Sequence, residues 1–152
     1  MIKRSILFLV LNFTALFIGS QFTSSGVASF WYQHLNKAPW TPPGWLFGAA
    51  WTFIMICFAI YMAFLFKNTS GSKWKIVLFL IQWLLNVSWN PIFFYGQLIF
   101  WGLVCIVFLL FTVIFLFIGF YKEMKIRNLL LAPYLIWLVI ATSLNTYIFI
   151  YN

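Results

Sequence analysis

Acidic residues are almost absent from this sequence, which has one Asp or Glu in 152 residues, together with one His and two Cys. The single acid, Glu123, cannot form the carboxylate pair that acid/base hydrolysis uses, and His34 has no neighbouring Cys or acid in sequence to orient it as a base. Cys57 and Cys105 lie in apolar runs without a Cys-x-x-Cys pattern, so we predict packing roles for both and no metal site. Conventional acid/base and metal chemistry therefore has no support in the sequence.

Charge of either sign is scarce: 7% of the residues are charged and 65% are hydrophobic, with a mean hydropathy of +1.03. Such a chain cannot cover a soluble core with polar surface, so we predict an integral membrane protein. A helix needs roughly 20 apolar residues to cross the hydrocarbon, and the charge-free runs supply five such helices. We expect an all-α membrane protein with a single domain over residues 1–152, a five-transmembrane-helix bundle with helices near 5–27, 44–66, 74–95, 98–121 and 128–151.

Basic residues divide unequally between the two predicted faces of the membrane. With five crossings, eight of the nine Lys and Arg residues fall on the face of the N-terminus, and only Lys37 falls on the other. The positive-inside rule then places the N-terminus and Ser70 in the cytoplasm and His34, the first loop and the C-terminus outside the cell (inner) membrane. The basic residues are scattered at helix ends and form no basic face. We therefore explain the net charge of +8 by membrane topology and by anionic lipid headgroups, and we do not expect nucleic-acid binding. The N-terminal run also resembles a cleavable signal peptide, an alternative that leaves this orientation unchanged.

A row of neutral amides interrupts the third apolar run. Gln82, Asn86 and Asn90 recur at every fourth position, with Trp89 beside them, so on a helix they line one face. An unpaired amide in hydrocarbon costs several kcal/mol, so this row should face partner helices or an internal pocket rather than lipid. Both readings, a cavity wall and paired amides that join helices, stay open at this point. Pro91 removes a backbone hydrogen bond near the end of the row.

The longest connection, residues 28–43, carries three prolines and several aromatic residues. We predict one or two helical turns through residues 30–35, followed by a stiff, extended segment over residues 36–43. Trp31, Tyr32 and Trp40 are typical of an interfacial aromatic belt or of a lid over a cavity, and these two interpretations are equally compatible with the sequence.

Aromatic faces and neutral amides are the chemical groups that this sequence does offer. Trp51 shares a helix side with Phe47 and Met55, and a second mixed face follows in the last helix at Trp137, Ala141, Leu144 and Asn145. These groups suit a large, flat, mostly apolar ligand that is held by stacking and oriented by a few hydrogen bonds. Trp is also redox-active and photochemically active, so it is the side chain to suspect in any light-driven or oxygen chemistry.

Three segments carry a resemblance to a known family: residues 37–52 (Lys-Ala-Pro-Trp-Thr-Pro-Pro-Gly-Trp-Leu-Phe-Gly-Ala-Ala-Trp-Thr), residues 86–94 (Asn-Val-Ser-Trp-Asn-Pro-Ile-Phe-Phe) and residues 133–137 (Pro-Tyr-Leu-Ile-Trp). With them, nearly the whole chain resembles the tryptophan-rich sensory protein and translocator protein (TspO/MBR) family, also called peripheral benzodiazepine receptors. The resemblance implies a homodimeric five-helix bundle with an internal ligand cavity under the first loop. It also implies binding of protoporphyrin IX-type tetrapyrroles and of synthetic isoquinoline or benzodiazepine-type ligands, and in some bacterial members light-dependent porphyrin breakdown.

Matching positions carry the family's ligand contacts over to this chain. The implied ligand-binding residues are Tyr32, Pro42, Trp51, Asn86, Trp89, Trp101, Trp137, Ala141 and Leu144. Trp51 and Trp137 are the candidates for a catalytic role, as electron donors beside the tetrapyrrole. Two departures from the family pattern are evident: Ala49 stands where Pro is frequent, and residues 147–152 lack the basic residue of the cholesterol-recognition pattern.

Three functions are compatible with these residues: a tetrapyrrole-binding protein with Trp-assisted photo-oxidation, a passive tetrapyrrole carrier or channel, and a ligand-responsive membrane sensor or scaffold. We favour the first. Small residues at Gly44 and Gly48, and at Ala15 and Gly19, further predict close helix contacts in a homodimer.

Overall fold

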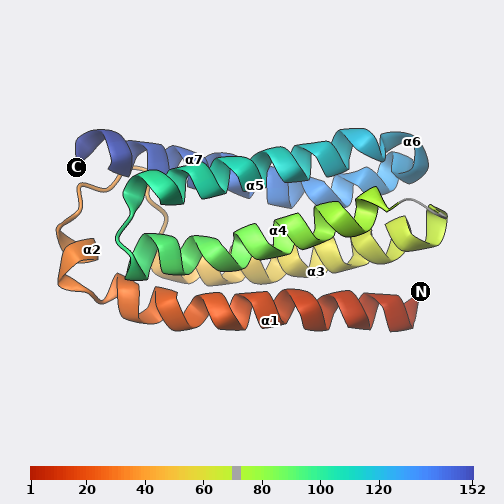
Figure 1. Ribbon diagram of the computed structural model, residues 1–152, viewed down its shortest axis with the longest axis horizontal. Helices are drawn as coiled ribbons and strands as arrows, with labels where there is room; N and C mark the ends of the chain where they lie inside the picture. Colours follow the sequence, from red (N-terminus) through yellow and green to blue (C-terminus); the bar gives the residue numbers. More distant parts are fainter. Residues whose placement is uncertain (70–72) are drawn as a thin grey trace.

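A computed structural model describes residues 1–69 and 73–152, and every regular element in these ranges is helical (Figure 1). Ser70 therefore lies outside the described residues. The elements are α1 (Ile2–Val27), α2 (Phe30–His34), α3 (Gly44–Asn68), α4 (Trp74–Asn90), the π-helical turn η1 (Pro91–Tyr95), α5 (Ile99–Gly119), α6 (Tyr121–Met124), the 3-10 segment η2 (Lys125–Leu131) and α7 (Ala132–Tyr151).

Five helical segments are long and apolar enough to cross a membrane: Ile2–Val27, Gly44–Asn68, Trp74–Tyr95, Ile99–Gly119 and Tyr121–Tyr151. Large apolar side chains point outward from them, as for Phe17, which is 67% exposed, and Phe115, which is 63% exposed. Because such side chains would be costly in water along a whole helix, the outer surface requires a lipid environment. The predicted five-helix, multi-pass membrane fold is confirmed.

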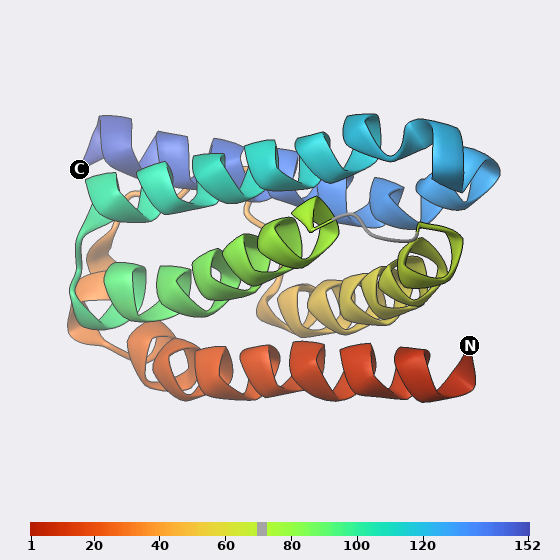
Figure 2. The same ribbon diagram turned by 45° about the vertical axis from the view of Figure 1, so that its right-hand side comes forward.

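The long helices run side by side along the bundle (Figures 1 and 2). Helix α1 packs on α3 and α4, α5 packs on α4 and α7, and α3 also contacts α7. The resulting order around the bundle is α1, α3, α7, α5, α4. Residues far apart in sequence, on α3, α4 and α7, can therefore face one another across its interior.

Helix ends depart from the predicted bounds where proline or the chain reversals intervene. Pro91 begins a π-helical turn in which the Gly96 amide donates to the Pro91 carbonyl at 2.8 Å, because proline has no N–H to continue α4 regularly. The predicted last helix divides between Leu131 and Ala132: residues up to Leu131 have 3-10 geometry, and α7 begins at Ala132 with Pro133 in its first turn. The predicted turn over residues 30–35 is confirmed as α2, and no helix forms over residues 36–43.

Small residues of α1 make contacts within the bundle rather than with a second copy. Ala15 is 3% exposed, and a Cβ placed on Gly19 would lie 2.5 Å from Nδ2 of Asn90 on α4. The predicted dimer contact through Ala15 and Gly19 is therefore wrong, because the same chain already occupies that surface. A Cβ on Gly44 or Gly48 would meet nothing within 4 Å, so this pair alone remains open to a partner.

Candidate functional site

The inner face of α7 is the face predicted from the sequence. Trp137, Ala141, Leu144 and Asn145 are all buried. Helix α3 packs its aromatic residues against this face: the ring centroid of Phe47 lies 5.3 Å from that of Trp137, and Trp51 lies 5.8 Å from Tyr134, both edge-on. The two tryptophans proposed as electron donors thus come from helices that adjoin at the bundle interior.

Tyr134 connects α7 with the amide row of α4. Its hydroxyl oxygen accepts a hydrogen bond from Nε2 of Gln82 at 2.7 Å and another from Nδ2 of Asn86 at 3.1 Å. The third amide of the row, Asn90, accepts a bond from the hydroxyl of Thr23 on α1 at 2.7 Å. The row therefore joins α4 to two other helices. Sequence reasoning missed Tyr134. A buried amide row requires polar partners, and the hydroxyl of Tyr134 in the last span is a group that could have been proposed for this role.

Several polar atoms beside this network have no hydrogen-bond partner within the described residues. Among them are Nε1 of Trp89, Nε1 of Trp137 and Oδ1 of Asn145. Trp89 stacks on Phe93 at 5.1 Å with an interplanar angle of 10°. A Cβ placed on Gly102 would lie 3.0 Å from the Phe93 ring and 3.6 Å from Oδ1 of Asn145, so these groups of η1 and α7 converge on one point of α5.

The first loop covers the same end of the bundle. Tyr32 lies 5.4 Å from Phe94, and burial raises the pKa of its phenol above the ordinary value, so the group stays neutral at physiological pH. Lys37 donates to the carbonyl of Tyr32 at 2.8 Å and lies over its ring. Pro42, the other predicted loop residue, is half-buried just before α3.

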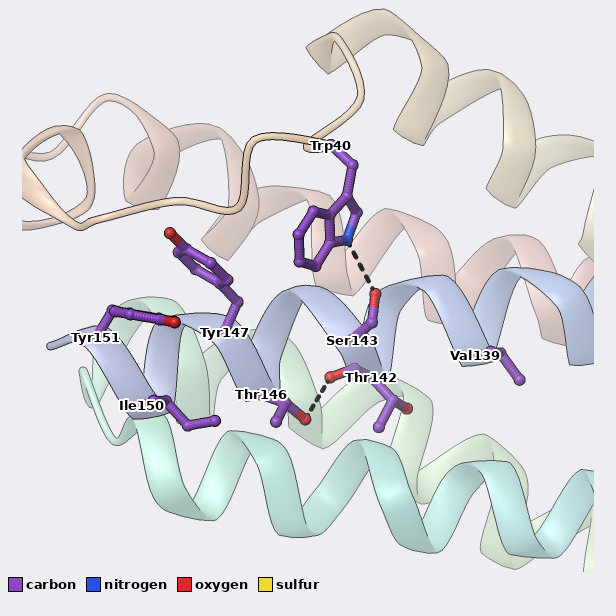
Figure 3. Close-up of a pocket in the computed structure, with 8 residues that line it drawn as sticks. All are labelled: Trp40, Val139, Thr142, Ser143, Thr146, Tyr147, Ile150 and Tyr151. Carbon is purple, nitrogen blue, oxygen red and sulfur yellow. Dashed lines mark hydrogen bonds between the residues drawn. The ribbon is translucent and has the colours of Figure 1, made fainter.

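Two attachments join the rest of the loop to α7. Trp40 donates its indole N–H to the hydroxyl of Ser143 at 3.2 Å and meets Tyr147 edge-on at 5.5 Å (Figure 3). Asn36 and Asn152 exchange hydrogen bonds, with the Asn36 amide donating to Oδ1 of Asn152 at 2.9 Å and Nδ2 of Asn152 donating to the Asn36 carbonyl at 3.2 Å. The extended segment is thus anchored at its start to the C-terminal residue after α7 and near its middle to α7 itself.

Two grooves lie on the outer surfaces of the bundle. One, of about 440 Å³, runs along α7 below Trp40, on the side opposite the inward-facing Ala141 and Leu144 (Figure 3). The other, of about 600 Å³, lies between α4 and α5. Neither is the enclosed cavity predicted beneath the first loop, and that cavity stays a prediction.

Trp101 does not join the other predicted ligand contacts. Its side chain is 57% exposed and lines the outer groove between α4 and α5, whereas the next residue, Gly102, faces inward against Phe93. Successive helical residues point about 100° apart, so the close approach at Gly102 directs Trp101 outward. Trp101, which the family resemblance implies as a ligand contact, therefore faces outward and not the interior between α3, α4 and α7.

Comparison with known proteins identifies the fold family. A sequence model of the TspO/MBR family matches residues 7–151. The chain belongs to the TspO/MBR family. The family inferred from the sequence motifs is thereby confirmed, and the match includes four of the five spans of this TspO/MBR-family chain in full and most of the first.

Relatives of this TspO/MBR-family chain span bacteria, archaea and animals. It is 38% identical to the tryptophan-rich protein TspO of Chlorobaculum tepidum, with 85% of this chain and 83% of the relative covered. Identity is 36% to the tryptophan-rich protein TspO of Archaeoglobus fulgidus, with coverages of 90% and 88%. Identity is 32% to the translocator protein of Homo sapiens, with 85% of this chain and 78% of the relative covered.

Proposed function

We propose that this TspO/MBR-family protein binds a tetrapyrrole of the protoporphyrin IX type between α3, α4 and α7, beneath the first loop, and promotes its light-dependent oxidation. The observation that carries the proposal is the pair of buried indole N–H groups of Trp89 and Trp137 that have no partner within the described residues. Synthetic isoquinoline or benzodiazepine-type ligands would use the same site.

Unpaired indole groups indicate what such a ligand must offer. An indole N–H is only a donor, and a buried donor without an acceptor costs about 1–3 kcal/mol. A ligand with carboxylate or carbonyl oxygens satisfies these donors. The stacked rings of Trp89 and Phe93 add a flat apolar surface, which suits a macrocycle.

The photochemistry needs no group beyond the ligand, the indoles and dioxygen. In the proposed step the light-excited macrocycle takes an electron from the indole of Trp51 or Trp137 and passes it to dioxygen. The macrocycle then donates one electron to the oxidised indole, which restores the tryptophan. The net change is one electron moved from the tetrapyrrole to dioxygen, with the protein restored. Among the described residues, no group of three or more His, Cys, Asp or Glu is placed to hold a metal ion, so the scheme uses none.

Absorption spectra of the purified protein with protoporphyrin IX, recorded before and after illumination, test this function. Trp89→Phe is expected to weaken binding about fivefold, because it removes an N–H donor worth about 1 kcal/mol while the flat ring remains. Trp101→Phe is the matched control, since this side chain lies in the outer groove. Equal affinity of both variants and the parent would refute the site.

Carrier and sensor functions are distinguished by other measurements. A carrier moves tetrapyrrole across sealed vesicles in the dark, and a sensor changes its protein partner when ligand binds. Either result without photoproduct would replace the oxidative part of the proposal and leave the binding site intact.

The cell membrane and a cytoplasmic N-terminus complete the proposal. In a variant without Cys57 and Cys105, a thiol at His34→Cys should be labelled from outside intact cells, and one at Asn68→Cys should be protected. Both positions are exposed. They are the last residues of α2 and α3, and these two helix ends lie at opposite ends of the bundle (Figure 1). The reverse labelling pattern would invert the topology.

The homodimer stays a prediction, now limited to the exposed surface at Gly44 and Gly48 on α3. Small residues there would let a second copy approach closely.

A further inference from the structure

One end of the bundle carries nearly all of the charge. Figures 1 and 2 show the N-terminus, the end of α3, the start of α4 and α6 together at this end. All Lys and Arg residues except Lys37 belong to these elements or to η2, or, as Lys73 does, directly precede α4, and the only acidic residue of the chain, Glu123, lies among them. The chain has no further carboxylate side chain with which to neutralise the excess.

Three of these cations come from three different elements and meet the last turns of α3. Nη1 of Arg4, on α1, donates to the carbonyl of Phe66 at 3.0 Å. Lys75, on α4, donates to the carbonyl of Thr69 and lies 4.7 Å from the centroid of the Phe66 ring. Arg127, on η2, lies 4.6 Å from the centroid of the Phe64 ring. With Lys67 of α3 itself, these residues form what we name the cationic collar: Arg4, Lys67, Lys75 and Arg127.

The protein itself compensates only part of the collar's charge. A helix C-terminus carries about half a negative charge, and the two phenylalanine rings contribute their electron-rich faces. Arg4, Lys67 and Arg127 are exposed. A guanidinium has five N–H donors. Arg4 uses one of them to bond the Phe66 carbonyl of α3, and Arg127 contacts α3 by lying over the face of the Phe64 ring. Free donors and uncompensated charge therefore point away from the bundle.

Apolar side chains adjoin the collar in sequence and remain exposed. Trp74, which precedes Lys75, is 69% exposed, and Ile126, which precedes Arg127, is 76% exposed. Cations beside exposed apolar and indole side chains, at the ends of membrane-spanning helices, are typical of the level of lipid headgroups. A soluble acidic partner or a free anion would leave Trp74 and Ile126 in water.

We propose that the three exposed cations of the cationic collar, Arg4, Lys67 and Arg127, bind the phosphate groups of anionic phospholipids in the adjoining leaflet, and that this binding holds the end of α3 against α1 and η2, beside the buried contact of Lys75 with α3. The inference is independent of the tetrapyrrole site and of which leaflet is cytoplasmic. Lipid phosphates complete the charge balance that the single carboxylate of the chain leaves open.

The test is thermal unfolding of the full chain in nanodiscs of phosphatidylcholine, with and without phosphatidylglycerol. Anionic lipid is expected to raise the unfolding midpoint by about 4 °C, and high salt should reduce the rise. The variant Lys67→Gln/Arg127→Gln should lose most of the rise. Its midpoint in pure phosphatidylcholine should change little, because neither side chain makes a hydrogen bond within the described residues and only the exposed contact of Arg127 with the Phe64 ring is lost. Lys37→Gln, at the opposite end of the bundle, is the matched control and should keep the full rise of the unfolding midpoint with phosphatidylglycerol.

Two results would overturn the proposal. The first is a rise that the double variant retains, or no rise in the parent protein. The second is an equal rise with inorganic phosphate in detergent, which would make free phosphate the ligand. Adding Arg4→Gln removes a third cation, and a further loss of lipid-dependent stabilisation would support its place in the collar.

Discussion

Light-driven loss of protoporphyrin IX is expected to fall about tenfold or more in Trp51→Phe, equivalent to roughly 1.4 kcal/mol of activation free energy, while binding changes little. Phenylalanine keeps an aromatic ring against Tyr134, which Trp51 meets edge-on at 5.8 Å, but it is much harder to oxidise than indole. Trp137→Phe should lower the rate similarly and also weaken binding, because its buried indole N–H has no partner within the described residues. Rates are therefore compared at saturating ligand.

The control for both variants is Trp74→Phe, which lies at the cationic end of the bundle, away from the proposed site. It should bind and degrade the tetrapyrrole like the parent protein. If Trp51→Phe and Trp137→Phe also degrade it at the parent rate, the two indoles are walls of the site and not electron donors. If degradation falls only in proportion to binding, the protein is a binder or carrier.

Tyr134→Phe is expected to lower the free energy of unfolding by about 1–2 kcal/mol, the largest stability effect that we predict for removal of a single atom. The hydroxyl accepts hydrogen bonds from both Gln82 and Asn86, and all three residues are buried. Its loss leaves two amide donors without their acceptor in the bundle interior. Individual hydrogen bonds between membrane helices average only about 0.6 kcal/mol, so the loss of two together should be needed for an effect of this size.

Tyr61→Phe provides a matched comparison. Tyr61 is also fully buried, but its hydroxyl makes one bond, to the carbonyl of Leu116 at 3.1 Å. Unfolding in detergent should show Tyr134→Phe to be at least twice as destabilising as Tyr61→Phe. Equal effects would mean that Gln82 and Asn86 find other partners, and the α4–α7 network would then be dispensable.

The sequence alone determined the spans, because hydropathy and the scarcity of charge leave the hydrocarbon as the only environment for five long apolar runs. It also determined that the amide row of α4 and the mixed face of α7 are inward, since an unpaired amide is too costly in lipid. Asn86 and Asn145 were predictable for this reason. The family followed from the motifs of residues 37–52, 86–94 and 133–137, and the family comparison confirmed it.

The tertiary structure decided which apolar residues face inward and which partners the amides meet. Where a membrane helix has no row of polar residues, all of its sides are apolar and its periodicity carries little information about orientation. The sequence therefore did not predict that Trp101 faces outward or that Gly19 packs against Asn90 of the same chain. Tyr134 became the partner of Gln82 and Asn86 only because the helices are arranged in the order α1, α3, α7, α5, α4. That order depends on close approaches at small residues, which are properties of the assembled bundle and not of any one helix.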